Sequence, residues 1–128
     1  MAAMNAVVWF EIYTHDLARA RAFYETVLGI ALEPLPAPDG MGGFEMLAFP
    51  GGPDSPGAGG TLCRMEGMSP GVGGTLVYFS CADCAVEAAR VEAAGGTLQQ
   101  GKTPIGEYGA IALALDTEGN LFGLHSMA

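Results

Sequence analysis

The chain has 128 residues and a mass of 13.1 kDa, the size of one ordinary domain with its own core. Half of the residues are hydrophobic and 15% are charged, yet no apolar run approaches the roughly 18 residues that a membrane span needs. Five Lys and Arg against fourteen Asp and Glu give a formal charge of −9, which argues against binding to a phosphate backbone. Composition therefore predicts a single globular domain, 1–128, that takes neither nucleic acid nor a membrane as its partner.

The first five residues contain no basic segment followed by an apolar core, so we expect no targeting peptide and a cytoplasmic protein. The three cysteines are an odd number and do not suggest a disulfide framework. Cys81 and Cys84 form a C-x-x-C that could act as a redox dithiol, because a helix N-terminus stabilises a thiolate. We favour the alternative that both are small buried hydrophobic residues. A zinc site would need Cys63 and the two histidines as well.

The first half of the chain predicts a strand followed by an amphipathic helix. The aromatic and β-branched run Val7–Tyr13 is typical of a strand. Asp16 is the expected helix N-cap, and apolar residues recur at helical spacing over Leu17–Leu28. Gly29 suits the left-handed position just past the helix end.

The second half repeats this pattern, which indicates an internal duplication. Thr75–Ser80 is the expected strand, Asp83 the N-cap, 84–94 an alanine-rich helix, and 95–96 its glycine stop. Asp83 follows Asp16 by 67 positions, and Gly96 follows Gly29 by the same distance. The two first strands therefore align without a gap.

Short β segments follow each helix, so each half is expected to be a βαβββ module of an α+β fold. Module one spans about 5–67 and module two about 74–127, with the predicted later strands at 30–35, 44–49, 61–65, 97–100, 110–115 and 121–125. A turn-rich segment, 116–120, joins the last two strands. The Gly/Pro-rich segments 50–60 and 68–74 are read as a loop and a linker, because neither has the pattern of a phosphate-binding loop.

Strand alternation predicts which side chains of the first strand face the helix. The apolar residues Val8, Phe10 and Ile12 should pack beneath it. The opposite face should line a cavity, and carries Trp9, Glu11 and Tyr13, with Leu76, Tyr78 and Ser80 as their duplicates.

The sequence resembles the vicinal oxygen chelate superfamily, the group of the glyoxalases, bleomycin-resistance proteins and extradiol dioxygenases. The resemblance covers nearly the whole chain and is carried by residues 9–12, 16–20, 23–24, 27–29, 91–96 and 116–126. It implies paired βαβββ modules whose sheets form a cupped cavity, and commonly a homodimer.

Enzymes of this superfamily hold a metal with His or Glu side chains on the first and last strand of each module. The resemblance places these ligands at Trp9, Leu76, Gly123 and either Thr61 or Leu62. None of these side chains is a His or carboxylate ligand for a divalent ion. We therefore expect no metal and no other cofactor, and neither lactoylglutathione lyase nor extradiol dioxygenase activity.

Glu11 and His125 are the candidate catalytic residues. Both are expected on the cavity side, where a carboxylate can orient an imidazole for acid/base work. The alternative is that His125 is a strand-end residue bonded to backbone, and that Glu11 is a polar wall residue bonded to Tyr78 or to backbone amides. His15 precedes a helix cap and is expected to be exposed.

The candidate ligand-binding residues surround Glu11. Trp9, Tyr13 and Tyr78 would supply aromatic walls, which with one carboxylate suit a flat or cationic molecule. The expected loop 102–109 adds Lys102, Glu107 and Tyr108 near the cavity mouth.

Three functions remain open from these residues. The first is a metal-free binding protein for a small organic molecule, similar to bleomycin-resistance proteins that sequester drugs. The second is a metal-independent isomerase or lyase that uses Glu11 and His125. The third is a displaced divalent-ion site formed by Glu11, His125 and Glu107.

Overall fold

A computed structural model describes residues 5–38, 40–117 and 119–128. The chain divides into two compact units. The N-terminal unit is Trp9–Thr75, and the C-terminal unit consists of the described residues up to Val8 together with Leu76–Ala128. Among the described residues, no helix has the length and apolarity needed to cross a membrane.

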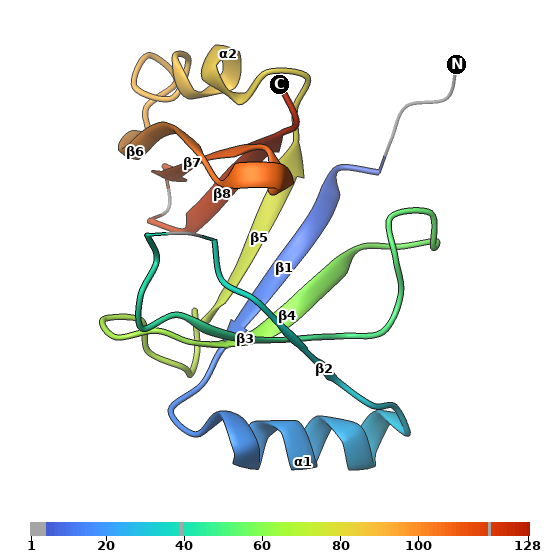
Figure 1. Cartoon of the computed structure of the whole chain (residues 1–128). Coiled ribbons are helices and arrows are strands. Elements are labelled where there is room, and N and C mark those ends of the chain that lie inside the picture. The colour runs from blue at the N-terminus through green and yellow to red at the C-terminus, as the bar shows by residue number, and fades with distance from the viewer. Residues whose placement is uncertain (1–4, 39, 118) are drawn as a thin grey trace. The chain divides into compact units, whose positions relative to one another are not determined.

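The N-terminal unit contains one helix and strands in the predicted βαβββ order (Figure 1). Its elements are β1 (Val7–Tyr13), α1 (Leu17–Leu28), β2 (Glu33–Leu35), β3 (Glu45–Ala48) and β4 (Gly59–Arg64). The strands are ordered β2-β3-β4-β1. The pair β4 and β1 is parallel, and the other two pairs are antiparallel.

The capping residues of α1 are those that the sequence predicted. The Asp16 side chain accepts a hydrogen bond from the backbone N–H of Arg19 at 3.0 Å, which satisfies one of the unpaired donors of the first turn. Gly29 has φ 66° and ends the helix in the left-handed conformation. The predicted helix bounds are therefore confirmed.

One side of the α1 helix packs on one face of this sheet. Leu32, Leu47 and Leu62 form the buried centre of the cluster, and Ile12 and Tyr24 pack against it. Aromatic rings extend the cluster, with ring centroids of Phe10 and Phe49 at 5.4 Å and of Tyr24 and Phe49 at 5.8 Å. Large apolar side chains thus fill the space between helix and sheet.

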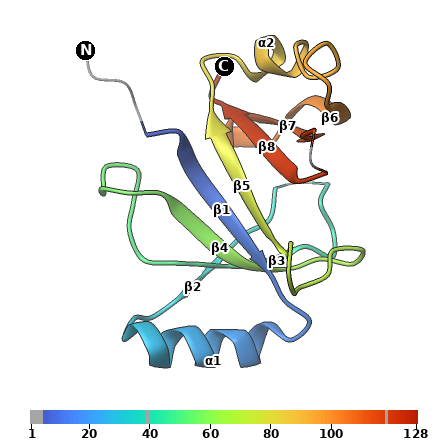
Figure 2. The same cartoon turned by 180° about the vertical axis from the view of Figure 1, so that it is seen from behind.

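The C-terminal unit repeats this connectivity with different element lengths (Figure 2). Its elements are β5 (Thr75–Ser80), α2 (Cys84–Ala88), β6 (Thr97–Pro104), η1 (Gly106–Tyr108), β7 (Ala110–Leu115) and β8 (Leu121–Ser126). The strands are ordered β5-β8-β7-β6, with β5 and β8 parallel. The first and last strands of both units are therefore parallel neighbours, as a duplication requires.

The second helix is shorter than predicted. The expected helix 84–94 ends at Ala88, and the chain continues as turns in which the Arg90 N–H donates to the Glu87 carbonyl at 3.0 Å. A Cβ on Gly96 would lie 2.5 Å from the Leu115 carbonyl oxygen, so the backbone at Gly96 passes very close to strand β7. The alanine-rich pattern therefore overestimates the length of this helix.

Two further predictions about local structure are corrected. Strand β6 continues to Pro104 with irregular pairing, so Lys102 lies in a strand rather than in a loop. Strand β2 starts at Glu33, three residues later than the predicted segment 30–35. In the predicted turn 116–120, Glu118 lies outside the described residues, and the Asn120 N–H donates to the Asp116 carboxylate at 2.9 Å.

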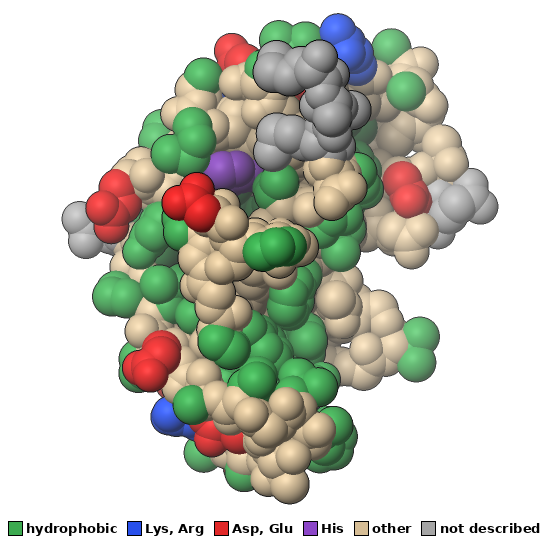
Figure 3. All heavy atoms as spheres, turned by 90° about the vertical axis from the view of Figure 1, so that its right-hand side faces the viewer, with side chains coloured by type: hydrophobic (Ala, Val, Ile, Leu, Met, Phe, Trp, Pro, Cys, Tyr) green, Lys and Arg blue, Asp and Glu red, His purple; other side chains and the backbone are tan. Residues whose placement is uncertain are grey.

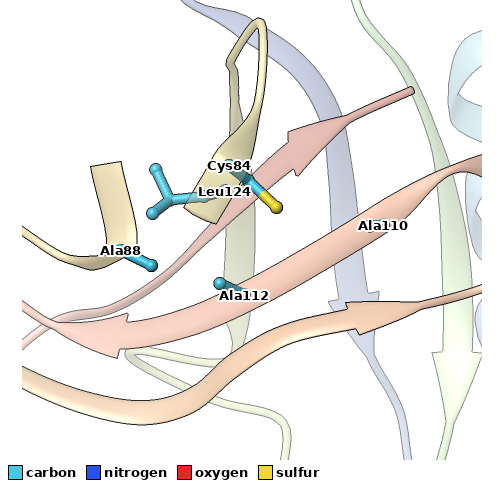
Figure 4. Close-up of a cluster of buried hydrophobic side chains, with 5 residues drawn as sticks. All are labelled: Cys84, Ala88, Ala110, Ala112 and Leu124. Carbon is cyan, nitrogen blue, oxygen red and sulfur yellow. The ribbon is translucent and has the colours of Figure 1, made fainter. Parts of the chain in front are cut away.

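The core of the C-terminal unit consists mainly of small side chains around Leu124 (Figure 4). Its buried members are Cys84, Ala88, Ala110, Ala112 and Leu124. The fully buried Cys84 opens α2, and Cys81 packs against the same cluster. All three cysteines are free.

Burial raises the pKa of Cys81 to about 11, and the carboxylate of Glu87 adds to this effect. A redox dithiol needs a stabilised thiolate, so the structure supports the packing role of the C-x-x-C.

Candidate functional site

The two faces of β1 carry different chemistry, as alternation predicted. Phe10 and Ile12 pack with the α1 cluster. Trp9, Glu11 and Tyr13 alternate with them and project from the opposite face. We call this face the open face of the N-terminal unit because α1 packs on the other one.

Glu11 is a buried carboxylate on this open face, with 6% of its surface exposed. Its Oε1 accepts a hydrogen bond from the Tyr13 hydroxyl at 2.6 Å. This short bond fixes the orientation of the carboxylate and offsets part of the cost of removing it from water.

The neighbouring strand places two more buried polar side chains beside this pair. Thr61 faces Glu11 across the parallel ladder, and Cys63 faces Tyr13. Thr61 Oγ1 and Cys63 Sγ are 3.0 Å apart. Burial raises the pKa of Cys63 to about 12, and the negative charge of Glu11 adds to this effect. The thiol of Cys63 therefore stays protonated at neutral pH.

Trp9 borders this group on the same face. Its register partner is Gly59, and a Cβ built on that glycine would lie 3.2 Å from Cζ3 of the indole. The ring thus lies against the bare backbone of β4. Trp9 is only half-buried, so it offers a flat aromatic surface next to the carboxylate.

The C-terminal unit has a comparable pair. Tyr78 faces Gly123 across the parallel strands β5 and β8. A Cβ on Gly123 would lie 2.8 Å from Cγ of the tyrosine ring and still closer to two other ring carbons. The ring therefore occupies the space into which any side chain at position 123 would project.

His125 projects on the same side of β8 as Gly123, because Phe122 and Leu124 alternate with it and pack under α2. Its Nε2 lies 2.6 Å from the Tyr108 carbonyl oxygen, so this nitrogen donates the hydrogen bond. This is the backbone-bonded arrangement that the sequence left open. In the neutral ring, Nδ1 then carries the lone pair.

The remaining predicted ligand contacts, Lys102, Glu107 and Tyr108, also belong to the C-terminal unit, and the structure gives them other interactions. Lys102 Nζ forms an ion pair with Asp83 Oδ1 at 2.8 Å. The pair raises the pKa of Lys102 and lowers the pKa of Asp83, in each case mainly through their mutual hydrogen bond. Glu107 is exposed on η1, and Tyr108 contributes the backbone carbonyl that His125 binds.

The register of the parallel strand pairs decides between Thr61 and Leu62 as the fourth position that the resemblance assigned to a metal ligand. Thr61 faces Glu11 as Gly123 faces Tyr78, and Tyr78 follows Glu11 by the repeat distance of 67. Thr61 is thus the counterpart of Gly123, whereas Leu62 lies in the α1 core.

The four residues at these positions do not fit a divalent metal ion. They are Trp9, Thr61, Leu76 and Gly123, which offer no imidazole or carboxylate. The space at Gly123 is filled by a ring, and the Thr61 hydroxyl lies against a thiol. Across the described residues, no three His, Cys, Asp or Glu side chains gather as a metal site requires, and Glu11 lies in a different unit from His125 and Glu107.

Sequence reasoning missed the contacts that close these positions. It did not predict that rings pack over Gly59, Gly60 and Gly123. It also did not predict the contact between Thr61 and Cys63. One signal was available, because a glycine inside a strand often marks a close approach of another group.

The surface charge agrees with the composition. On the face shown in Figure 3, Asp and Glu side chains are scattered among hydrophobic and uncharged ones, and Lys and Arg side chains are few. This face carries no basic patch of the kind that binds a phosphate backbone.

Comparisons with known proteins agree with this architecture. A family model described as bleomycin resistance protein-like N-terminal matches residues 6–46. No curated protein matches the chain.

Solved structures with a similar fold include two epimerases. A variant of methylmalonyl-CoA epimerase from Streptomyces coelicolor, in complex with 2-nitronate-propionyl-CoA, is 18% identical, with a TM-score of 0.67 over 98% of this chain and 99% of that chain. The methylmalonyl-CoA epimerase of Mycobacterium tuberculosis is 19% identical, with a TM-score of 0.67 over 100% of this chain and 93% of that chain. A hypothetical protein from Bacillus halodurans is 13% identical, with a TM-score of 0.66 over 94% and 92%.

The chain therefore has the glyoxalase-like α+β fold. The N-terminal match and this fold agree with the resemblance of the sequence to the glyoxalase and bleomycin-resistance group.

Proposed function

We propose that this chain is a metal-independent member of the glyoxalase and bleomycin-resistance superfamily, and that it binds a small organic molecule against the open face of the N-terminal unit. The observation that carries the proposal is the buried carboxylate of Glu11, fixed by Tyr13 at 2.6 Å. Trp9 adds a half-buried aromatic surface beside it.

The chemistry of this face favours a flat, positively charged ligand. An indole face attracts a cation through its quadrupole, and a carboxylate in a poorly hydrated setting attracts it more strongly than one in water. The formal charge of −9 on the chain would also favour the approach of a cation.

A binding experiment with two small ions tests this proposal. Trp9 is the single tryptophan of the chain, so its intrinsic fluorescence reports directly on this face. Phenyltrimethylammonium should change the emission saturably, and benzenesulfonate, a flat anion, should not. Equal binding of both ions, or of neither, would overturn the assignment.

A pair of variants separates the role of Glu11 from a general effect of charge. Glu11→Gln keeps an oxygen that accepts from Tyr13 but removes the negative charge. It should weaken binding of phenyltrimethylammonium about tenfold, equivalent to about 1.4 kcal/mol. The exposed Glu33→Gln, in the same unit, should leave binding unchanged. If Glu11→Gln binds as tightly as wild type, the carboxylate is a structural group.

The second candidate is a metal-independent isomerase or lyase in which Glu11 and His125 act as acid and base. The hydrogen bond from His125 Nε2 to the Tyr108 carbonyl favours it, because it leaves Nδ1 to exchange protons in the neutral ring.

This second candidate has its own assay. Methylmalonyl-CoA, which a neighbouring epimerase binds, is a suitable probe because its acidic α-proton exchanges in deuterated water under base catalysis. Exchange accelerated by the chain, and lost in both Glu11→Gln and His125→Asn, would support catalysis. Exchange at the uncatalysed rate would leave binding as the function.

We also propose that the chain forms a homodimer in the cytoplasm. The exposed apolar side chains Phe23, Val27 and Leu28 on α1 support self-association, since their exposed fractions lie between 55% and 61%. Light scattering after gel filtration should give twice the mass of the chain. A monomer mass at micromolar concentration would contradict the proposed dimer.

A further inference from the structure

The N-terminal unit contains a cavity beyond the ends of two neighbouring strands. Its volume is about 320 Å³. Most of its lining comes from the segments that follow the parallel strands β1 and β4. His15 belongs to the first of these segments, and Met65 and Met68 belong to the second. One imidazole and two thioethers therefore lie around a single cavity.

The strand pairing keeps these two segments together. Tyr13 and Cys63 are register partners at the end of the parallel ladder. The pairing continues past the end of β1, because the Thr14 N–H donates to the Cys63 carbonyl at 2.8 Å. The next residue is His15, and its carbonyl accepts a hydrogen bond from Arg64 Nε at 3.3 Å. His15 is thus held beside the last residue of β4.

A tight turn brings the two methionines close to each other. The Met68 N–H donates to the Met65 carbonyl at 3.1 Å. Gly67, the third residue of this turn, has φ 90°, the left-handed backbone that a type II turn needs at that position. Such a turn holds its first and fourth Cα atoms within about 7 Å of each other. Both methionines are half-buried, so their side chains are partly sheltered from water.

The charges around the cavity do not oppose a cation. Arg64 lines the cavity, but its Nη1 forms an ion pair with Glu45 Oε1 at 3.4 Å. Glu66 adds a second carboxylate to the lining. The formal charge of −9 on the whole chain acts in the same direction.

The donor atoms around the cavity favour one kind of ion. Thioether sulfur is a soft ligand that selects Cu(I), and imidazole also suits copper. Magnesium and calcium take oxygen ligands instead. Zinc sites in proteins are built from thiolate, imidazole and carboxylate groups rather than from thioethers.

We propose that His15, Met65 and Met68 bind one Cu(I) ion in this cavity. The imidazole and the two sulfur atoms supply three ligands from two adjacent segments of chain. The site is distinct from the four positions that the resemblance assigned to a divalent ion, because the lining of the cavity includes none of them.

This inference is independent of the proposed function. The cavity is lined by neither Glu11 nor Trp9, and an organic cation on the open face does not need the methionines. Glu11→Gln should therefore bind Cu(I) like wild type. Each proposal can fail while the other holds.

Titration of the full-length chain with Ag⁺ tests the site, with the methionine methyl groups isotopically labelled for NMR. Ag⁺ has the same charge and the same preference for soft ligands as Cu(I), and air does not oxidise it. The methyl signals of Met65 and Met68 should shift together and saturate, and Cu(I) added under nitrogen should shift the same two signals. The methyl signal of Met127, which is 69% exposed and outside the cavity lining, should not shift.

Three results would overturn the proposal. Ag⁺ taken up only by the cysteine thiols would leave the signals of Met65 and Met68 unchanged. Equal shifts at Met127 would show that exposed thioethers bind Ag⁺ without a site. The same shifts with Zn²⁺ would show that the cavity does not select a soft ion.

Conservative variants identify the ligands. Met65→Leu and Met68→Leu keep the volume of the side chain but remove the sulfur. Each should weaken Cu(I) binding at least about tenfold, a loss that is common even for groups behind a metal ligand. Competition with a coloured Cu(I) chelator under nitrogen measures this change.

Met127→Leu is the matched control and should bind Cu(I) like wild type. His15→Asn, at an exposed position, removes the imidazole, should also weaken binding, and keeps the test open if a methionine variant does not fold. Wild-type affinity in any folded variant of the three proposed ligands would contradict the assignment.

Discussion

The ring of Tyr78 covers the backbone of Gly123, its register partner in the parallel strands β5 and β8. The N-terminal unit shows the same relationship twice, since Trp9 covers Gly59 and Phe10 covers Gly60. In each case a ring from the first strand lies on a glycine of the last strand. At position 123, to which the resemblance assigned a metal ligand, this packing leaves no room for a side chain.

Adding one methyl group at position 123 should be destabilising. In Gly123→Ala, the new Cβ would collide with the Tyr78 ring, and such overpacking typically costs about 1–3 kcal/mol of unfolding free energy. Urea denaturation followed by the fluorescence of Trp9 measures this loss.

Two further variants test whether the ring is the cause. Gly101→Ala should have little effect, because no atom lies within 4 Å of the place that its Cβ would occupy and its backbone is not left-handed. Replacing the ring in Tyr78→Leu should recover part of the loss in a double mutant, which a double-mutant cycle detects. Strictly additive effects of the two substitutions would show that the contact is not responsible.

The hydrogen bond of His125 should hold the segment between β6 and β7. His125→Phe removes the donor to the Tyr108 carbonyl and should cost about 0.5–1.5 kcal/mol. The Ile105 N–H donates to the Gly109 carbonyl in the same segment, so its hydrogen exchange should become faster. His15→Phe, at an exposed position, should leave this amide unchanged. Equal protection of Ile105 in His125→Phe and wild type would contradict this role.

The ion pair of Asp83 and Lys102 should stabilise the chain within a defined pH range. Asp83 has a lowered pKa, so its contribution is present above its unfolded value, near 3.8, and is lost as pH falls through the folded value. Lys102 has a raised pKa, so its contribution is present below its unfolded value, near 10.5, and is lost as pH rises through the folded value.

Asp83→Asn tests this range because asparagine also caps a helix but carries no charge. Its Tm should lie below that of wild type at neutral pH, and the difference should shrink toward both acidic and alkaline pH. Asp54→Asn, at an exposed position with no ion pair in the described structure, is the charge-matched control. A difference that does not vary with pH would point to an effect other than the ion pair.

The cysteines should react slowly with thiol reagents in the native chain. With a pKa of about 11, Cys81 would hold roughly a hundredfold less thiolate at pH 8 than an unperturbed thiol. Pulsed alkylation with iodoacetamide, read by peptide mass spectrometry, should label Cys81 and Cys63 mainly after unfolding in urea. Labelling of native Cys81 at the rate of free cysteine would revive its interpretation as a redox group.

Much of the local structure could be predicted because short-range signals in this sequence agree with one another. Asp16 and Gly29 define α1 by capping chemistry, and alternation assigned Glu11 to the face opposite Phe10. By contrast, the alanine-rich run after Ala88 predicted more helix than forms, and the chain instead brings Gly96 close to β7. That contact joins residues far apart in the chain, and helix propensity does not report it.

The candidate site was less predictable for a similar reason. Alternation places a side chain on a face, but does not determine its hydrogen-bond partner. Lys102 was expected to contact a ligand and instead pairs with Asp83, 19 residues earlier in the chain. The bond between His125 and the Tyr108 carbonyl likewise depends on the path of a loop.

Metal analysis of the chain, purified without chelators, is the decisive check on whether Trp9, Thr61, Leu76 and Gly123 replace a metal site. We expect bound zinc, nickel, cobalt and iron well below one ion per chain, and an unchanged Tm after each divalent ion is added. A stoichiometric ion whose removal by chelator lowers the Tm and whose return restores it would show that the chain has kept a metal site.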